Sequence, residues 1–326
     1  MLVTQQCRRR DFFGEINPQF RRLDREQYSF DTLDSVDVVF CTALLSFVFD
    51  MTFSPSPIAR VHFERNQCTR GDRDAFVEHR RQVTELIANT ASSSHRRLCL
   101  LGVGNGNDVE LEVLAKRFDE ICLVDLDDTA LRQCVDGLSA TTASRIMLQA
   151  GVDLSCVLSQ LDSLHAEPSV SEHPLDDLAM LARDLPPQID LGQWDVVVST
   201  CLLSQLIDSV FIAIGVDHPR SAELVLAVRD GHLAQLAALT SGHGKSLLIT
   251  DFVSSDTLPE LLHVSDDQLQ SLVHHAVANR NFFTGLNPAV LLHRLQKNNV
   301  VVKAYPAWRW NLGTRCFAVC AIETVS

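Results

Sequence analysis

The residues most able to do chemistry are three glycines and one aspartate between positions 102 and 125. Gly102, Gly104 and Gly106 alternate in a turn that follows a short apolar run, and Asp125 ends the next apolar run. Glycines let the backbone turn tightly and approach a ligand closely. A carboxylate at the end of the second strand can accept hydrogen bonds from a ribose diol. The spacing therefore predicts a strand, turn, helix and second strand that hold a nucleoside cofactor at the carboxyl edge of a parallel sheet.

The glycine turn departs from the pattern of sites that bind a pyrophosphate. The dinucleotide fingerprint G-x-G-x-x-G has its third glycine where this chain has Asn107. The following helix is expected to open with Asp108 and Glu110, with Asn107 as N-cap and Glu110 as its partner in a capping box. Carboxylates at the positive end of a helix disfavour a dianion there and favour a cationic amine or sulfonium.

With these features the chain resembles the class I methyltransferases that depend on S-adenosylmethionine (SAM). Their first motif is an apolar strand followed by G-x-G-x-G, and an acidic residue ends their second strand. The pair Trp194-Asp195, followed by an apolar run and a small polar turn, is similar to their fourth motif. The resemblance covers residues 72–326 and implies SAM as cofactor, with S-adenosylhomocysteine (SAH) as product. The cofactor-binding positions that it implies are Gly102, Val103, Gly104, Asn105, Gly106, Asp108, Asp125, Leu126, Val152, Asp153, Ser199, Thr200 and Cys201.

Apolar runs and helical periodicity alternate along the rest of this region. Strands are predicted at 98–101, 121–125, 145–149, 194–198, 245–251, 300–305 and 315–322, with a polar turn at 199–201 after the fourth. Helices are predicted at 74–88, 128–138, 203–210, 221–239 (broken only by Gly231), 265–280 and 288–296. The last two strands, joined through residues 308–313, lie too close in sequence to be parallel neighbours. An ordinary dinucleotide-binding domain would end on parallel strands. We therefore expect an α/β fold with a doubly wound, mostly parallel, Rossmann-like seven-stranded sheet and an antiparallel C-terminal strand.

Two segments are additions to this minimal sheet. Residues 1–71 contain no recognisable motif but are rich in aromatic residues from Phe12 to Phe53, which predicts a mainly helical N-terminal cap. Residues 255–286 leave the end of the fifth predicted strand and are predicted to form a lid. The expected organisation is a cap at 1–71 and a SAM-binding domain at 72–326 that contains the 255–286 insertion.

Composition excludes several classes of protein. The net charge of −13 argues against nonspecific nucleic-acid binding, and Arg8-Arg9-Arg10 is interpreted as a solvated arm. The ten cysteines show no C-x-x-C spacing, and the histidines show no ligand spacing, so no metal is expected. The most apolar stretch, 38–49, is shorter than the roughly 20 residues of a membrane span. We expect a cytoplasmic monomer or homodimer that binds neither nucleic acid nor membrane.

The favoured function is transfer of a methyl group from SAM to an oxygen, nitrogen or sulfur nucleophile of a small molecule. The turn after the fourth predicted strand lacks the Asn/Asp-Pro-Pro-Tyr and Pro-Cys patterns of enzymes that methylate bases. A hydroxyl acceptor would need a general base, for which Asp251 is the first candidate and His62 and His79 are weaker ones. The alternatives are an aminopropyltransferase-like enzyme on the same fold and a non-catalytic SAM-binding protein.

Overall fold

The computed structural model describes residues 56–166, 172–184, 191–298 and 301–325. Seven strands form one sheet in the order β3-β2-β1-β4-β5-β7-β6. Their bounds are β1 Arg97–Leu101, β2 Glu120–Asp125, β3 Ile146–Ala150, β4 Trp194–Thr200, β5 Thr240–Ser254, β6 Val301–Leu312 and β7 Arg315–Val325. The strands β1 to β5 pair in parallel, whereas β7 lies antiparallel between β5 and β6. The predicted mixed sheet with an antiparallel C-terminal strand is confirmed.

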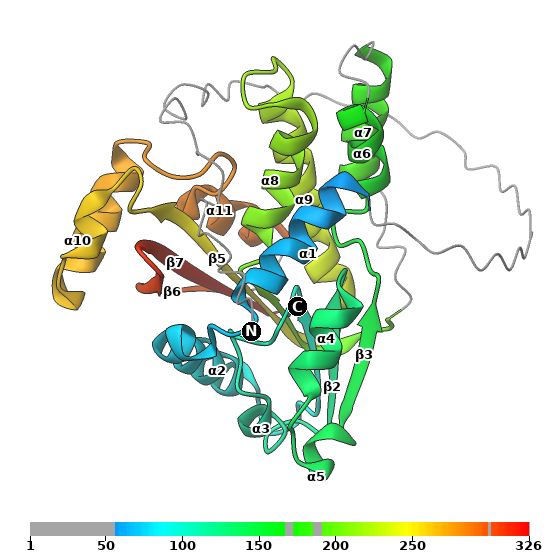
Figure 1. Cartoon of the computed structure of the whole chain (residues 1–326). Helices are drawn as coiled ribbons and strands as arrows, with labels where there is room; N and C mark the ends of the chain where they lie inside the picture. The colour runs from blue at the N-terminus through cyan, green and yellow to red at the C-terminus, as the bar shows by residue number, and fades with distance from the viewer. Residues whose placement is uncertain (1–55, 167–171, 185–190, 299–300, 326) are drawn as a thin grey trace, which may run out of the picture.

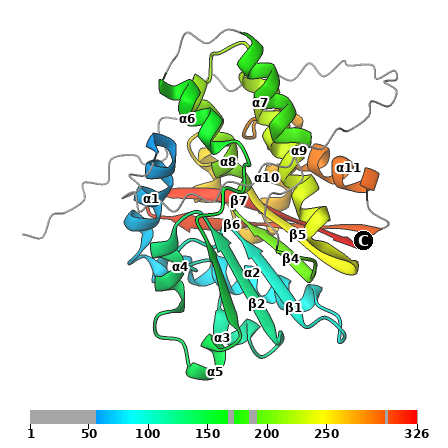
Figure 2. The same cartoon turned by 90° about the vertical axis from the view of Figure 1, so that its right-hand side faces the viewer.

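Helices cover both faces of this sheet (Figures 1 and 2). One face is covered mainly by α8 and α9, with α6 and α7 beyond them, and the other by α2 and α3. The helices are α1 Pro57–Thr69, α2 Val77–Thr90, α3 Leu111–Leu114, α4 Asp128–Val135, α5 Ala140–Ala143, α6 Leu158–Ala166, α7 Glu172–Asp184, α8 Leu203–Ile214, α9 Ser221–Leu239, α10 Asp266–Ala278 and α11 Pro288–Asn298, with single 3₁₀ turns at η1 Arg73–Phe76 and η2 Pro259–Leu262.

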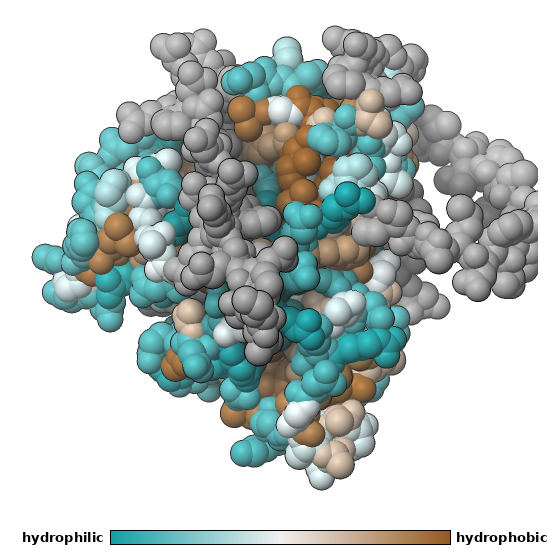
Figure 3. Space-filling model, viewed as in Figure 1, coloured by the Kyte–Doolittle hydropathy of each residue, from teal (hydrophilic) through white to brown (hydrophobic). Residues whose placement is uncertain are grey.

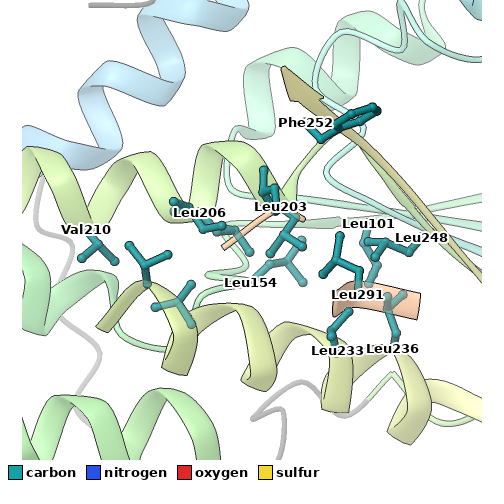
Figure 4. Close-up of a cluster of buried hydrophobic side chains, with 14 of the residues drawn as sticks. Leu101, Leu154, Leu203, Leu206, Val210, Leu233, Leu236, Leu248, Phe252 and Leu291 are labelled. Carbon is teal, nitrogen blue, oxygen red and sulfur yellow. The ribbon is translucent and has the colours of Figure 1, made fainter. Parts of the chain in front are cut away.

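The central strands are apolar at successive positions because both of their faces are buried. In β1, Cys99 and Leu101 face the cluster under α8 and α9, while Leu98 and Leu100 face the cluster under α2. This follows from the two-residue period of a strand between two helical layers. Figure 4 shows how leucines of α8 and α9 meet those of β1 and β5. The carboxyl ends of the strands are thereby held rigidly beneath the loops that follow them.

Two strands are longer than their sequence patterns predict. Residues 241–244, which precede the predicted strand at 245–251, belong to β5. The predicted linker at 308–313 is mostly the end of β6, so that only Gly313 and Thr314 separate β6 from β7. In β6 the extension follows from antiparallel pairing with β7, as in Trp310↔Phe317. These strand boundaries depend on pairing with distant residues, which local patterns do not reveal.

The predicted cap and lid are described only in part. Residues 1–55, including Phe12 to Phe53, lie outside the described residues. The helix α1 crosses the carboxyl edge of the sheet and contacts α4, α6 and α8 (Figure 1). The 255–286 segment forms η2 and α10, and Gln270 of α10 bonds the backbone of Ala307 in β6. Its function as a lid stays a prediction.

The surface seen in Figure 3 is mainly hydrophilic outside the grey residues, with an apolar strip over the region of α8. Within the described ranges, none of the helices has the length and apolar character needed to cross a bilayer.

Candidate functional site

The three glycines between β1 and α3 all adopt a left-handed backbone. Their φ angles are 74° at Gly102, 50° at Gly104 and 68° at Gly106, a region that favours glycine. The turn is also crowded, because a Cβ at Gly102 would lie 2.7 Å from Leu202 Cβ and one at Gly106 would lie 2.3 Å from Cys134 Sγ. Both the conformation and the space therefore require glycine at these positions.

Asp125 ties the end of β2 to this turn. Its Oδ2 accepts a 2.7 Å hydrogen bond from the Gly104 amide, and its Oδ1 accepts a 2.9 Å bond from the Asp127 amide. Burial raises the pKa of Asp125 to about 6, although the two amide bonds favour the ionised form. Each carboxylate oxygen can accept more than one hydrogen bond. The side chain can therefore keep the turn in place and still accept from a bound ligand.

The predicted capping box at Asn107 and Glu110 is wrong. The helix α3 has a single turn, begins at Leu111, and has no side-chain cap. Asn107 Nδ2 instead donates to the carbonyl of Thr69 at 2.9 Å, and Glu110 pairs with Arg73 at 2.9 Å. The carboxylates of Asp108 and Glu110 therefore do not lie in the first turn of a long helix, as the sequence had led us to expect.

The asparagines of the glycine turn bond the end of α1. Asn105 Nδ2 donates to the Asn66 carbonyl at 2.6 Å, in the same way as Asn107 donates to Thr69. The last carbonyls of a helix have no partner within the helix, so these two amides complete α1. The helix is thereby fixed directly over the turn, with Asn66 Oδ1 2.8 Å from where a Cβ of Gly104 would lie.

Two adjoining cavities lie at this edge of the sheet. The larger, of about 870 Å³, lies between α1, α4 and α6, and the smaller, of about 60 Å³, lies beside the glycine turn. Asn66, Leu126, Asp153 and Leu158 line both of them. Seven of the predicted cofactor-binding residues line one or both cavities, namely Gly102, Gly104, Asn105, Asp125, Leu126, Val152 and Asp153.

The other six predicted positions are not among the residues that line these two cavities. Val103 is buried in the core, and Gly106 packs against Cys134. Thr200 Oγ1 donates to the carbonyl of Leu101 at 3.2 Å, and Ser199 Oγ lies 2.9 Å from His232 Nε2. Asp108 and Cys201 belong to the neighbouring polar cluster described below. Their assignment to the cofactor stays a prediction.

Asp153 fixes the loop after β3. Its Oδ1 accepts from the amide and the hydroxyl of Ser155 at 2.8 and 2.6 Å, and its Oδ2 accepts from the Leu158 amide at 2.8 Å. These bonds hold the loop and the start of α6 against both cavities. The assignment of Asp153 to the cofactor stays a prediction.

Four polar residues that line the smaller cavity come from α1 and α8 and were not assigned to the cofactor from sequence: His62, Asn66, Gln205 and Ser209. Asn66 Nδ2 donates to Asp127 Oδ2 at 3.1 Å, and His62 Nε2 lies 2.8 Å from Ser209 Oγ. These contacts join residues 61 and 147 positions apart in the chain. A local motif could not have identified them.

A buried polar cluster lies next to the cavities, around the end of β4. His79 Nε2 is 3.2 Å from Asp108 Oδ1 and 3.9 Å from Cys201 Sγ, and His79 Nδ1 accepts from Trp308 Nε1 at 3.1 Å. Burial raises the pKa of the Cys201 thiol well above its usual value, so this cysteine is a neutral thiol rather than a nucleophile.

Asp251, the first candidate base, lies in this cluster and not in the wall of either cavity. Its Oδ1 accepts a 2.6 Å bond from Ser204 Oγ, and only 5% of the residue is exposed. Burial raises its pKa to about 6, with the Ser204 bond and nearby His79 acting in the opposite direction.

Asp251→Asn is expected to stabilise the protein above pH 6 by roughly 3 kcal/mol, the free energy that corresponds to the rise in the pKa of Asp251 from 3.8 to about 6. A raised pKa means that the folded state binds the proton of Asp251 more tightly than the unfolded state does. Binding of this proton therefore stabilises the folded protein fully below pH 3.8, and the stabilisation is lost as the pH rises through about 6. Asparagine keeps an acceptor for Ser204 without the charge. Urea unfolding of both proteins at several pH values measures the difference, which should shrink toward zero near pH 4. The exposed Asp119→Asn serves as control, and a loss of stability in Asp251→Asn at pH 8 would contradict the explanation.

Among the described residues, no group of three or more His, Cys, Asp or Glu side chains is arranged to hold a metal ion. The described walls of the site contain the glycine turn, carboxylates and the polar side chains of α1 and α8.

Comparison with known proteins gives similar solved structures but no sequence match. No protein-family model matches the chain, and no curated protein matches it. The YcgJ protein from Bacillus subtilis is 11% identical, with 74% of this chain and 96% of that chain covered at a TM-score of 0.40. An S-adenosyl-L-methionine-dependent methyltransferase described as putative, from Methanococcus maripaludis, is 13% identical, with 85% and 97% covered at a TM-score of 0.41. The N-methyltransferase NodS from Bradyrhizobium japonicum, solved with SAH, is 10% identical, with 80% and 97% covered at a TM-score of 0.39.

These sequence identities and TM-scores assign neither a cofactor nor an acceptor to this chain. The strand order, with β7 antiparallel between β5 and β6 and a glycine turn after β1, is observed in the chain itself. The chain therefore has the seven-stranded fold of the class I SAM-dependent methyltransferases.

Proposed function

We propose that this protein is a SAM-dependent methyltransferase that acts on a nucleophile of a small molecule. The observation that carries the proposal is the bond from the Gly104 amide to Asp125, at the edge of a cavity on the carboxyl side of the sheet. The glycine backbone lets a ligand approach closely, and the carboxylate can accept further hydrogen bonds from the hydroxyls of a ribose.

The lining of the two cavities supports a cationic nucleoside ligand. Asp125 would accept from the ribose hydroxyls, while Leu126 and Val152 offer apolar surface to an adenine. Arg70 is the one Lys or Arg among the described residues of the lining, against five aspartates: Asp125, Asp127, Asp128, Asp153 and Asp162. This balance favours a sulfonium over a pyrophosphate.

When bound, SAM would supply an electrophilic methyl group. The residues of this chain would hold the cofactor, align the nucleophile with the methyl group and sulfur, and exclude water, since alignment contributes a large part of such a rate enhancement. Leu202 and Leu206 supply apolar wall beside the glycine turn.

Calorimetry with SAM, SAH and NAD tests the cofactor. We expect micromolar-range binding of SAM and SAH, and no competition from excess NAD. Binding of NAD without binding of SAM or SAH would refute the proposal. Tighter binding of decarboxylated SAM than of SAM would favour the aminopropyltransferase alternative, and SAM binding without turnover on any acceptor would favour a non-catalytic binding protein.

Gly104→Val is a sharper test of the same site, and Gly137→Val is its matched control. Both glycines have a positive φ, 50° and 86°, so both variants carry similar backbone strain. A side chain at Gly137 meets nothing within 4 Å, whereas one at Gly104 meets Asn66 at the cavity. We expect SAH binding to be lost in Gly104→Val and retained in Gly137→Val. Equal affinity in the two variants would place the ligand elsewhere.

A further inference from the structure

The wall that α1 and α8 form beside the glycine turn contains one side chain able to take a proton from a bound acceptor. His62 lines the smaller cavity together with Gly102, Gly104 and Asp125. The other candidate bases, His79 and Asp251, are not among the residues that line either cavity. The tertiary structure thus reverses their order as candidates.

The hydrogen bonds of Ser209 fix the tautomer of His62. Ser209 Oγ donates its one proton to the Gln205 carbonyl, one turn earlier in α8, at 3.1 Å. The hydroxyl oxygen must therefore accept in its 2.8 Å bond with His62, so that His62 Nε2 carries the hydrogen. This leaves Nδ1 unprotonated, with a lone pair available as acceptor.

Burial, more than the surrounding charges, keeps the ring of His62 neutral. Arg65 lies one turn further along α1 and pairs with Asp208 of α8, and Asp162 of α6 accepts from the amide of Ile58. Burial and then the charge of Arg65 lower the pKa of His62 to about 4. The charges of Asp208 and Asp162 and a side-chain hydrogen bond between His62 and Gln205 act in the opposite direction. A neutral imidazole does not repel a sulfonium, and it can accept a proton at any pH well above 4.

We propose that the acceptor is a hydroxyl compound held between α1 and α8, and that Nδ1 of His62 takes the hydroxyl proton during methyl transfer. This inference rests on the proposed function. A lone pair of the hydroxyl oxygen forms the new bond to carbon, and the carbon–sulfur bond breaks with its electron pair left on sulfur. The O–H electron pair stays on oxygen, and the proton passes to Nδ1 and then to solvent.

The weak basicity of His62 suits an oxygen nucleophile. A hydroxyl oxygen that is forming a bond to carbon becomes a very strong acid, so a weakly basic imidazole is sufficient to take its proton. A thiol or an ammonium ion can lose its proton to solvent before the transfer, because its pKa lies within a few units of neutrality, whereas an alcohol keeps its proton until the new bond begins to form. A base positioned in the cavity therefore indicates a hydroxyl acceptor.

Nitrogen NMR of the full-length protein, labelled at histidine, tests the geometry without an acceptor. His62 should be neutral and protonated at Nε2 down to about pH 5, and its Nδ1 resonance should shift when SAH is added. Ser209→Ala should remove the tautomer preference. Ser163→Ala is its matched control, because Ser163 makes the same bond to a carbonyl one turn back and is exposed. A ring protonated at Nδ1, or one that SAH leaves unchanged, would overturn the assignment.

Transfer of labelled methyl from SAM to 4-methylphenol and to 4-methylbenzenethiol tests the chemistry. His62→Asn should slow transfer to the phenol by roughly 100-fold or more, the usual contribution of general base catalysis, and should leave transfer to the thiolate near that of the wild type. His274→Asn, at an exposed position of α10, is the control. No transfer to the phenol, or equal losses with both probes, would overturn the inference. Failure of SAH to bind in calorimetry would instead refute the proposed function.

Discussion

Gly231→Ala is expected to lower the free energy of unfolding by roughly 3 kcal/mol, at the upper end of the cost of overpacking. A Cβ at this position of α9 would lie 1.8 Å from the backbone carbonyl oxygen of Ala182, near the end of α7. A backbone atom cannot move aside as a flexible side chain can. The methyl group would therefore force α7 and α9 apart, and with them the packing of Leu178 and Leu236 in the core. Urea unfolding followed by circular dichroism measures the effect.

Gly71→Ala is the matched control for this variant. Gly71 is exposed, and an added Cβ there meets nothing within 4 Å. Its replacement should leave stability unchanged or raise it slightly, because alanine lowers the entropy of the unfolded chain. If Gly231→Ala were as stable as Gly71→Ala, the close approach of α7 to α9 would be wrong.

Asp125→Ala is expected to weaken SAH binding by roughly 1–3 kcal/mol, which is about 5- to 150-fold in the dissociation constant. The variant removes the acceptor proposed for the ribose hydroxyls. It also leaves the amides of Gly104 and Asp127 without the partners that they have in the folded protein. The turn should therefore lose order even without ligand, although removal of a buried ionised group offsets part of the loss in stability.

Calorimetric titration with SAH checks the affinity, and circular dichroism checks that the variant is folded. Asp119→Ala is the control, because Asp119 is exposed and precedes the opposite end of β2. Wild-type affinity in a folded Asp125→Ala protein would show that Asp125 is not the ribose acceptor. Equal losses in both variants would point to a general effect of charge rather than to a contact.

Local patterns of residues determined the order and type of the main elements. The apolar runs that end at Leu101, Asp125 and Val198 became central parallel strands, since a strand buried on both faces must be apolar at successive positions. The helix Ser221–Leu239 has the predicted bounds, but the predicted break at Gly231 is wrong, because α9 is continuous there. The short connection before β7 required an antiparallel ending, because a parallel pair needs a longer crossover. The glycine turn and Asp125 could be identified in the same way, since each depends on a backbone geometry encoded within a few residues.

The tertiary structure alone decided which other side chains join the glycine turn. Asn107 bonds the end of α1 rather than capping the following helix, and Asn105 bonds the end of α1 as well. His62 lines a cavity, and Asp251 is bonded by Ser204 outside the walls of both cavities. Each of these results depends on how helices separated by tens of residues pack over the sheet edge, as in the contact of His62 with Ser209, 147 positions away. Periodicity and capping rules describe only neighbours in sequence. The sequence by itself therefore determined the sheet and the candidate cofactor turn, and packing between distant elements decided the walls of the site.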